Sequence, residues 1–524
     1  MAVEHYGLLV AVAAIAFLIL KPLSAPKALR QLPSASPLAP FTTLWLVYHN
    51  WHGRRYLAVE EAHRKHGSAI RISPNQVSFS SPQAYKDIYG HGVPILKDIF
   101  YDNLAGDTPA MADSTNKEIH SAKRRTLAGI FAAKNITAME PKAQNATRDL
   151  LHAIEMKAHG KPVSPADMYP ISNVSTGEFD LRPWLNMFSF DAFSDILWSL
   201  PFGFLKRGTD ECLALGLDQK TTSVRAMQTF QTGVHFNTLC AQFAPALYSL
   251  LRRLGQTLRI ASRQNADHFT GMVRYRTVQR LTQPPAPPAV DIFSFLPTTA
   301  SDRVPSPMTL PDIVAECTSF LNAGNDTTQI SLTNTLFELA ANPTTQHHLH
   351  ATLVAHLPAT SRPTPPTPPS NTSPTSGPAS TNPSASTPPC ASASRAAPPA
   401  PAPPSPATPS PPTSPSPPPS TPSTTTPPSS ATPCATAPER WLPDHPASSD
   451  QERQHLRDFV LPFTLGPRAC IGRNLAYMEM SICLAALVMK FEFRVSEAAR
   501  TGYRHFERFN CSPRELMVSV RVRE

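Results

Sequence analysis

The spacing of hydrophobic and polar residues predicts mostly helices between residues 45 and 357. Hydrophobic positions recur every three to four residues in "HSAKRRTLAGIFAA" (120–133), in "WLNMFSFDAFSDILWSL" (184–200) and in residues 311–341. The stretch "SAIRISPNQVSFSSP" (68–82) instead alternates apolar and polar residues around a proline, which is typical of a small β-hairpin. The pattern therefore predicts a large, mainly helical α+β body with small sheets.

The N-terminus carries a hydrophobic segment that bears on location. Residues 7–20, "GLLVAVAAIAFLIL", are uninterrupted apolar residues followed by Lys21, Lys27 and Arg30. The segment is shorter than the roughly 20 residues that span a bilayer as a helix, although Lys21 can snorkel toward the interface. A cleaved signal peptide is the alternative, but it lacks a basic start and Pro26 follows the expected cleavage site. We expect residues 1–25 to form a single-pass anchor in the endoplasmic reticulum membrane, with the downstream chain in the cytosol.

Composition changes abruptly at residue 358. From 358 to 437 the chain contains no Glu or Asp, a single Gly and nearly half of its 59 prolines. Such a segment has no apolar face to bury, and its prolines prevent regular backbone hydrogen bonding, so we expect it to be disordered. Residues 26–357 and 438–524 would then be the two parts of one catalytic domain, separated by this tract.

Net charge and cysteine spacing exclude several classes of protein. The net charge of +9 is spread along the chain without a long basic run, which argues against a nucleic-acid partner and favours a membrane or an acidic partner protein. The 8 cysteines form no C-x-x-C pair and no regular spacing, which argues against a disulfide framework and a zinc site. We expect most of them to be buried thiols.

Cys470 differs from the other cysteines, because it stands in the turn "FTLGPRACIG" (463–472) just before an apolar helical segment. The positive end of that helix favours a thiolate, and Gly466 and Gly472 let the backbone approach a flat partner closely. Arg468 can bind a carboxylate of that partner, and Phe463 can shield the sulfur from water. These are the requirements for axial ligation of haem iron by a thiolate. A core cysteine in a turn would not explain the two glycines and the arginine together.

The same ten residues resemble the haem-binding signature of the cytochrome P-450 family, F-x-x-G-x-R-x-C-x-G, at every fixed position. The resemblance implies that Cys470 is the proximal thiolate ligand of haem b and that Arg468 binds a haem propionate. It also implies the family's fold, in which a long central helix crosses the haem.

A second motif lies inside the long segment 311–341. Gly and Thr are unfavourable inside helices, so Ala323-Gly324-Asn325-Asp326-Thr327-Thr328 indicates either a packing kink or a functional site. The cluster resembles the family's A/G-G-x-D/E-T-T segment, which passes the oxygen side of the haem. By this resemblance Ala323 and Gly324 lie against the haem, and the helix opens locally. Thr327 is then the hydroxyl and Asp326 the acid that relay protons to dioxygen.

Two weaker matches complete the resemblance. His120 and Arg124 resemble the W/H-x-x-x-R pair that hydrogen-bonds a haem propionate, although a basic helix face on the surface is the alternative. "PERW" (438–441) resembles the P-E-R-F/W element, in which Arg440 joins an ion network.

One family element is missing. A Glu-x-x-Arg helix should lie between the two main motifs, but the proline tract occupies that region, and Glu497-x-x-Arg500 follows Cys470 and cannot replace it. A buried arginine without its partners costs several kcal/mol, so this argues against a competent enzyme. The separation of Thr327 and Cys470 is close to that of the family, which favours a frameshifted or mis-assembled reading of the tract over a true insertion. Translation of the other two frames should then show the missing motif.

The family resemblance implies a monooxygenase that inserts one atom of dioxygen into a small apolar or aromatic substrate. Electrons would come from NADPH through NADPH-cytochrome P-450 reductase, which would dock near Arg468, Arg473 and Lys490. The stretches "IRISPNQVSFSS" (70–81) and "AYKDIYGHG" (84–92) resemble the fungal group that includes benzoate para-hydroxylases and pisatin-demethylase-like enzymes. The alternative from another class is an inactive relic that binds haem or a lipid and carries a disordered segment.

Overall fold

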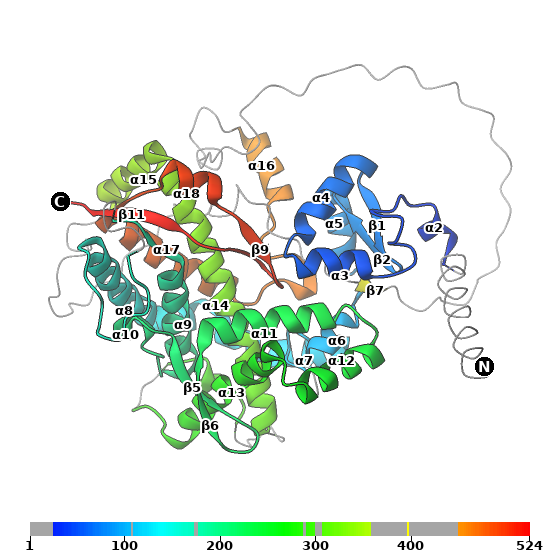
Figure 1. Cartoon of the computed structure of the whole chain (residues 1–524), viewed down its shortest axis with the longest axis horizontal. Helices are drawn as coiled ribbons and strands as arrows, with labels where there is room; N and C mark the ends of the chain where they lie inside the picture. The colour runs from blue at the N-terminus through cyan, green and yellow to red at the C-terminus, as the bar shows by residue number, and fades with distance from the viewer. Residues whose placement is uncertain are drawn as a thin grey trace, which may run out of the picture.

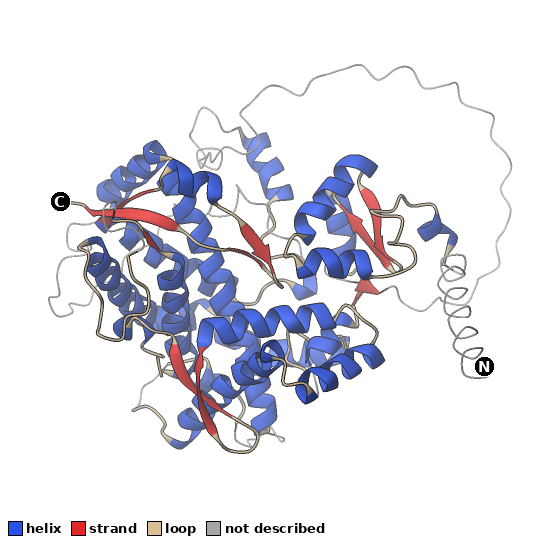
Figure 2. Cartoon of the chain, in the orientation of Figure 1, coloured by secondary structure: helices blue, strands red, loops and turns tan. Residues whose placement is uncertain are grey.

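The computed structural model describes residues 25–105, 108–171, 177–286, 290–298, 307–357, 396–397 and 449–524. Helices make up most of this part of the chain, and the strands form several small antiparallel sheets among them (Figures 1 and 2). The predicted mainly helical α+β class is therefore confirmed. The expected disorder of the tract and the structure of "PERW" concern residues outside the described ranges, apart from 396–397.

The N-terminal part forms a small lobe around the first hairpin, on one side of the molecule (Figure 1). Strands β1 and β2 pair antiparallel with Ala69 opposite Phe79, which confirms the hairpin predicted from residues 68–82. Helices α3 and α4 both pack against β1. The elements are α2 (Lys27–Arg30), α3 (Leu44–Trp51), α4 (Arg55–His66), β1 (Ala69–Ser73), β2 (Gln76–Phe79) and α5 (Pro82–Tyr89).

The next part of the chain supplies the helices that surround the centre. Helix α9 packs against both α8 and α14, and α11 packs along α13. The elements are β3 (Leu96–Lys97), α6 (Phe100–Ala105), α7 (Lys117–Ala128), α8 (Ala133–Ala158), β4 (Phe179–Asp180), α9 (Arg182–Trp198), α10 (Phe204–Arg207), β5 (Glu211–Leu215), β6 (Thr221–Arg225), α11 (Ala226–Cys240), α12 (Pro245–Thr257), α13 (Ala261–Thr282), α14 (Leu310–Ala341) and α15 (Pro343–His356).

The C-terminal part returns to this helical body and completes its sheets. Strand β11 lies between β4 and β8, so it pairs with a strand that precedes it by more than 300 residues. Helix α17 packs against α8, α14 and α15. The elements are β7 (Ala396–Ala397), α16 (Asp450–Phe459), α17 (Arg473–Lys490), β8 (Phe491–Arg494), α18 (Glu497–Gly502), β9 (His505–Glu507), β10 (Cys511–Pro513) and β11 (Met517–Val522).

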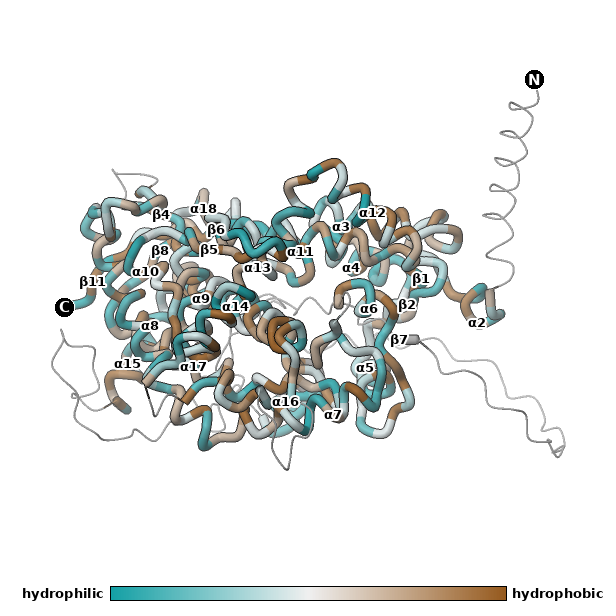
Figure 3. Tube along the Cα trace, turned by 90° about the horizontal axis from the view of Figure 1, so that it is seen from below, coloured by the Kyte–Doolittle hydropathy of each residue, from teal (hydrophilic) through white to brown (hydrophobic). Residues whose placement is uncertain are grey.

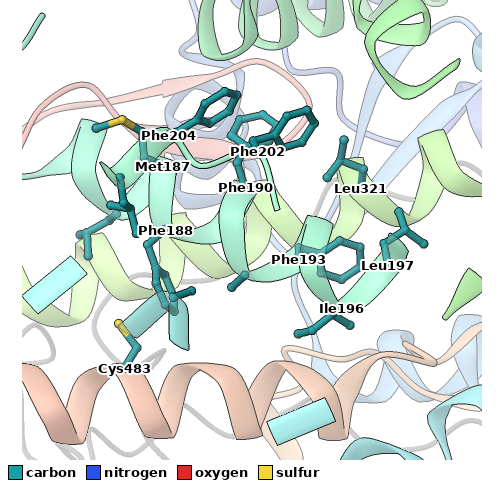
Figure 4. Close-up of a cluster of buried hydrophobic side chains, with 14 of the residues drawn as sticks. Met187, Phe188, Phe190, Phe193, Ile196, Leu197, Phe202, Phe204, Leu321 and Cys483 are labelled. Atoms are coloured by element: carbon teal, nitrogen blue, oxygen red, sulfur yellow. The ribbon is translucent and has the colours of Figure 1, made fainter. Parts of the chain in front are cut away.

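Helices α9 and α14 lie side by side in the middle of the molecule (Figure 3). Nearly every residue of α9 is buried, because its sequence is apolar on all sides and neighbours cover each face. Phe190, Phe202 and Phe204 pack together at one end of the core, with ring centroids 4.8 to 5.9 Å apart, and Cys483 of α17 lies near Phe188 at the other (Figure 4). This core fixes the position of α14.

The predicted localisation is corrected by the structure. Among the described residues no helix combines the length and the apolar character that crossing a membrane requires. The prediction of a single-pass endoplasmic reticulum protein is therefore wrong. Residues 7–20, from which it was made, lie outside the described part of the chain.

Candidate functional site

Cys470 lies in a closed loop between the 3-10 turn Gly466–Arg468 and helix α17. Its backbone N–H donates to the carbonyl of Phe463 at 2.9 Å, which joins the two ends of the loop. The thiol side chain is exposed, and α17 begins three residues later at Arg473 with Gly472 as its N-cap. The ring of Phe463 packs on Tyr477, with centroids 5.0 Å apart, so Phe463 supports the loop through α17.

Gly466 is required by the conformation of this loop. Its φ is +67°, in the left-handed region, and a Cβ at this position would collide with the carbonyl oxygen of Tyr89 at the end of α5. The close approach ties the cysteine loop to α5. Both the backbone angle and the available space therefore demand glycine here.

We expect Gly466→Ala to displace the cysteine loop, because the methyl group meets backbone that cannot move aside. The free energy of unfolding should fall by about 1 to 3 kcal/mol, measured by urea unfolding monitored by circular dichroism. Gly502→Ala at the end of α18 is a matched control, because a Cβ there meets no atom within 4 Å. Equal stability of the two variants would contradict the packing argument.

The ionisation of Cys470 differs from the sequence prediction. Cys470 keeps exposed surface, but the protein atoms packed around its sulfur displace part of the water there and raise the pKa of the thiol, while the backbone N–H of Gly472 and the charges of Arg124 and Arg473 act in the opposite direction. The N-terminal end of α17 therefore does not, by itself, hold a thiolate. A bound metal ion would be needed to deprotonate the thiol.

Four basic side chains gather beside the cysteine loop. Arg468 donates from Nη1 to the carbonyl of Ser114 at 2.8 Å and so points inward from the loop. Burial and the charges of Arg468, Arg124 and Lys97 lower the pKa of His120 to about 4. Neither the imidazole of His120 nor the guanidinium of Arg124 hydrogen-bonds to another described residue. The structure thus brings together His120, Arg124 and Arg468, and the arrangement suits an anionic ligand.

Lys97 is the fourth basic residue of this group and was not singled out from the sequence. Its Nζ donates to the carbonyl of Ala112 at 2.5 Å and lies 3.6 Å from the ring centroid of Tyr101. Burial lowers its pKa to about 8, with Asp113 opposing this and Arg468 adding to it. The pKa of Asp113 is itself raised to about 6 by burial. Lys97 stands in a two-residue strand without a recognisable motif, so no local signal identifies it.

Helix α14 carries the second group of predicted residues. A capping box at Thr309 and Asp312 starts the helix, which continues without a break to Ala341. The expected local opening is therefore not observed. The hydroxyl of Thr327 instead donates to the carbonyl of Ala323 at 2.6 Å, as threonines inside helices commonly do. Both residues are exposed on the same face of the helix, one turn apart.

Gly324 has a packing role in this structure. A Cβ at this position would collide with the ring of Phe193 on α9, so the glycine lets the two central helices approach closely. Its neighbour Asp326 is buried and also turns away from the Thr327 face. Its carboxylate accepts hydrogen bonds from Asn510 at 2.8 Å and Gln329 at 3.3 Å, and burial raises its pKa.

Helix α17 carries a buried carboxyl group. Glu479 is 1% exposed, and its Oε1 has no hydrogen-bond partner among the described residues. Burial alone raises its pKa to about 8. Glu497 and Arg500 lie exposed on α18, outside the core, so they do not replace the missing pair. Arg440 lies outside the described residues.

Comparison with known proteins places these features in one family. The cytochrome P450 family model matches residues 33–367 and 435–514. The chain is 26% identical over 529 residues to the benzoate 4-monooxygenase bphA of Aspergillus niger, which covers 99% of this chain and 98% of the relative. It is 24% identical over 460 residues to the cytochrome P450 monooxygenase poxM of Penicillium oxalicum, which covers 87% and 83%.

A solved structure shows the same fold. The crystal structure of a cytochrome P450 superposes with a TM-score of 0.60 at 15% identity, and the match covers 94% of this chain and 99% of that one. The fold predicted from the two motifs is thereby confirmed.

Proposed function

The chain belongs to the cytochrome P450 family, and from this premise we propose that it is a haem-thiolate monooxygenase acting on a small aromatic or apolar substrate. The observation that carries the proposal is the position of an exposed thiol, Cys470, next to four basic side chains. A flat dianionic ligand with a metal at its centre needs both features.

The residues present fit haem. Cys470 would be the axial ligand, and Arg468, Arg124, His120 and Lys97 would hold the propionates, whose charge offsets the repulsion within this basic group. Haem supplies the redox chemistry that splits dioxygen, with one oxygen atom going to the substrate and the other to water. The chain supplies the position of the haem, the substrate site and the protons.

Thr327 and Asp326 are proposed to deliver those protons. Thr327 presents its hydroxyl on the exposed face of α14, while Asp326 lies one residue away in a buried polar group. Burial raises the pKa of Asp326 above its ordinary value, so its carboxyl group holds a proton more readily than an exposed one does, as a proton donor requires. Ordered water between the two would complete the path.

Thr327→Ala is expected to leave haem binding intact but to lower product formation about 10- to 100-fold per NADPH consumed. The reason is that proton delivery is lost while electron delivery continues, so reduced oxygen leaves as hydrogen peroxide. NADPH use, peroxide and product are measured together. Thr335→Ala, two turns further along α14, is the control. Unchanged coupling in Thr327→Ala would remove this hydroxyl from the mechanism.

The substrate is proposed to be a small aromatic molecule. A hydrophobic cluster joins α6, α11, α12 and the loop between β9 and β10, with Phe100 and Phe509 stacked at 6.4 Å. An aromatic lining of this kind favours a flat, apolar guest wherever it borders the substrate site. The name of the Aspergillus relative indicates that benzoate is the first candidate to test.

An NADPH-dependent reductase is proposed as the electron donor, with a revised contact surface. Arg468 points inward, and Lys490 forms an ion pair with Glu155 at 2.7 Å, so these two contribute little free charge. Arg473 is exposed at the start of α17, near the segment that links α7 and α8. The exposed Arg125 and Lys134 flank this segment, so the basic surface has a different composition from the predicted one.

A reduced carbon monoxide difference spectrum of the full chain tests the proposed function. Thiolate-ligated haem gives a shifted absorption band, and its appearance together with hydroxylated benzoate would support the proposal. The alternative, an inactive or frameshifted product, rests on the missing Glu-x-x-Arg motif. A folded chain without this band, or another reading frame that restores the motif, would favour the alternative.

A further inference from the structure

A pocket of about 330 Å³ opens away from the cysteine loop. It lies where the start of α9 and the middle of α11 meet the hairpin β9–β10, and neither the loop around Cys470 nor the exposed face of α14 contributes to it. Its size is at the lower end of small-molecule pockets and exceeds what a bare inorganic ion needs. Its lining consists of Arg182, Gln231, Phe506, Arg508, Pro513 and Arg514.

Two of the three arginines are arranged around one aromatic ring. The guanidinium carbons of Arg508 and Arg514 lie 4.9 and 5.2 Å from the ring centroid of Phe506. The ring is held from outside by His235, with centroids 5.3 Å apart, and by the close approach of Gly53. Within the described ranges, neither guanidinium forms a hydrogen bond or an ion pair. Their donor groups are therefore available to a ligand.

Arg182 is the buried wall of the pocket. Arg182 is 8% exposed. Its Nε has no hydrogen-bond partner among the described residues, and its Nη2 donates to the hydroxyl of Ser512 at 3.3 Å. Burial lowers the pKa of Arg182, and burial followed by the charge of Arg182 lowers the pKa of Arg508 to about 10. Like charges in a partly buried site repel each other, and this repulsion raises the free energy of the folded chain. An anion bound between them removes the repulsion.

The nearby carboxylates do not already neutralise these arginines. Asp326 attracts Arg182 and Arg508 from α14, but its oxygens accept hydrogen bonds from Asn510 and Gln329. Asp180 faces Arg182, and its Oδ1 accepts from the backbone N–H of residues 182 and 516. Neither carboxylate forms an ion pair with the arginines in the part of the chain that the structure describes. Tyr169, Tyr503 and Glu515 are the other titratable groups near these side chains.

We propose that this pocket binds a small organic acid through its carboxylate, at a site separate from the haem pocket. Arg508 and Arg514 provide forked donors from the hairpin, Arg182 supplies buried positive charge, and Gln231 of α11 adds an amide donor. The ring of Phe506 and the side of Pro513 form the apolar wall for the rest of the molecule. The proposal concerns this chain's own residues and does not depend on catalysis.

Sodium benzoate is the probe, titrated into the full haem-loaded chain by calorimetry at two chloride concentrations. We expect binding that weakens with added chloride and loses at least tenfold in affinity in Arg508→Gln and in Arg514→Gln. Because Arg514 is exposed, its variant tests the site even if Arg508→Gln folds poorly. Arg504→Gln is the matched control, since Arg504 is exposed on the same hairpin segment, does not line the pocket and bonds only to backbone carbonyls. Its affinity should stay within threefold of the original.

Three results would overturn the proposal. The first is unchanged benzoate affinity in both pocket variants, and the second is an equal loss in Arg504→Gln. The third is equal affinity for benzyl alcohol or inorganic phosphate, which would remove the carboxylate or the organic part from the recognition. The haem absorption band is recorded in parallel and should respond to benzoate in Arg508→Gln as in the original chain. A missing response in every variant would count against the proposed function alone.

Discussion

Replacing Cys470 by alanine is expected to abolish the thiolate-shifted band of the reduced carbon monoxide spectrum completely. Cys483 on α17, the helix that follows the cysteine loop, and Cys317 on α14 are both fully buried in the core, so neither thiol can take the place of Cys470. Haem content should also fall, since the basic group would then hold the ligand only by its propionates. The measurement is the spectrum together with haem per chain, with circular dichroism to verify folding.

Two further variants make the result specific. Cys483→Ala removes a thiol from α17, the helix after the cysteine loop, and should keep the shifted band, at a cost of about 1 to 2 kcal/mol for the small cavity in the core. Cys470→His should bind haem through an imidazole and give the unshifted band. A shifted band in Cys470→Ala would show that another residue is the ligand.

Glu479→Gln is expected to stabilise the folded chain, by about 2 to 4 kcal/mol at pH 8. The pKa of Glu479 is about 8 in the fold and 4.5 as its ordinary value. Between these values the unfolded chain releases the proton while the folded chain retains it. The free energy of unfolding therefore decreases as pH rises from about 4.5 to about 8. Glutamine cannot ionise, so this decrease should disappear.

The measurement is urea unfolding of both proteins at several pH values between 5 and 8.5. The two stabilities should converge near pH 5 and separate as pH increases. Glu497→Gln makes the same chemical change on the exposed helix α18 and should follow the original chain. Parallel pH profiles for Glu479→Gln and the original chain would mean that the carboxyl group of Glu479 has a partner when folded.

The sequence was informative where local pattern and tertiary structure agree. Helix α14 could be placed almost to the residue, because its capping box and the Asn342-Pro343 boundary are both local signals. The hairpin of β1 and β2 was visible for the same reason. The pairing of β11 with β4 was not, since strand partners that lie far apart in the chain leave no periodic signal.

The candidate site shows the same division between local and distant effects. Cys470 and Arg468 stand in one motif and were found together, whereas Lys97 joins them only through folding. The sequence predicted that the end of α17 would favour the thiolate of Cys470, but loss of water around the sulfur has the larger effect and raises the pKa of the thiol. That loss of water depends on neighbours that are distant in the sequence. The close packing of Gly324 on Phe193 was likewise invisible without the second helix.

The hydrogen bond from Arg468 to Ser114 joins residues 354 positions apart, and Arg55 reaches Glu507 across 452. During synthesis, the first partners leave the ribosome long before the second ones exist. The side chains of His120, Arg124 and Lys97 therefore cannot contact Arg468 until almost the whole chain has been made. Contacts between residues far apart in the sequence slow folding, and apolar surface stays exposed until these contacts form. We therefore expect the yield of folded protein in a cell to rise when chaperones are co-produced.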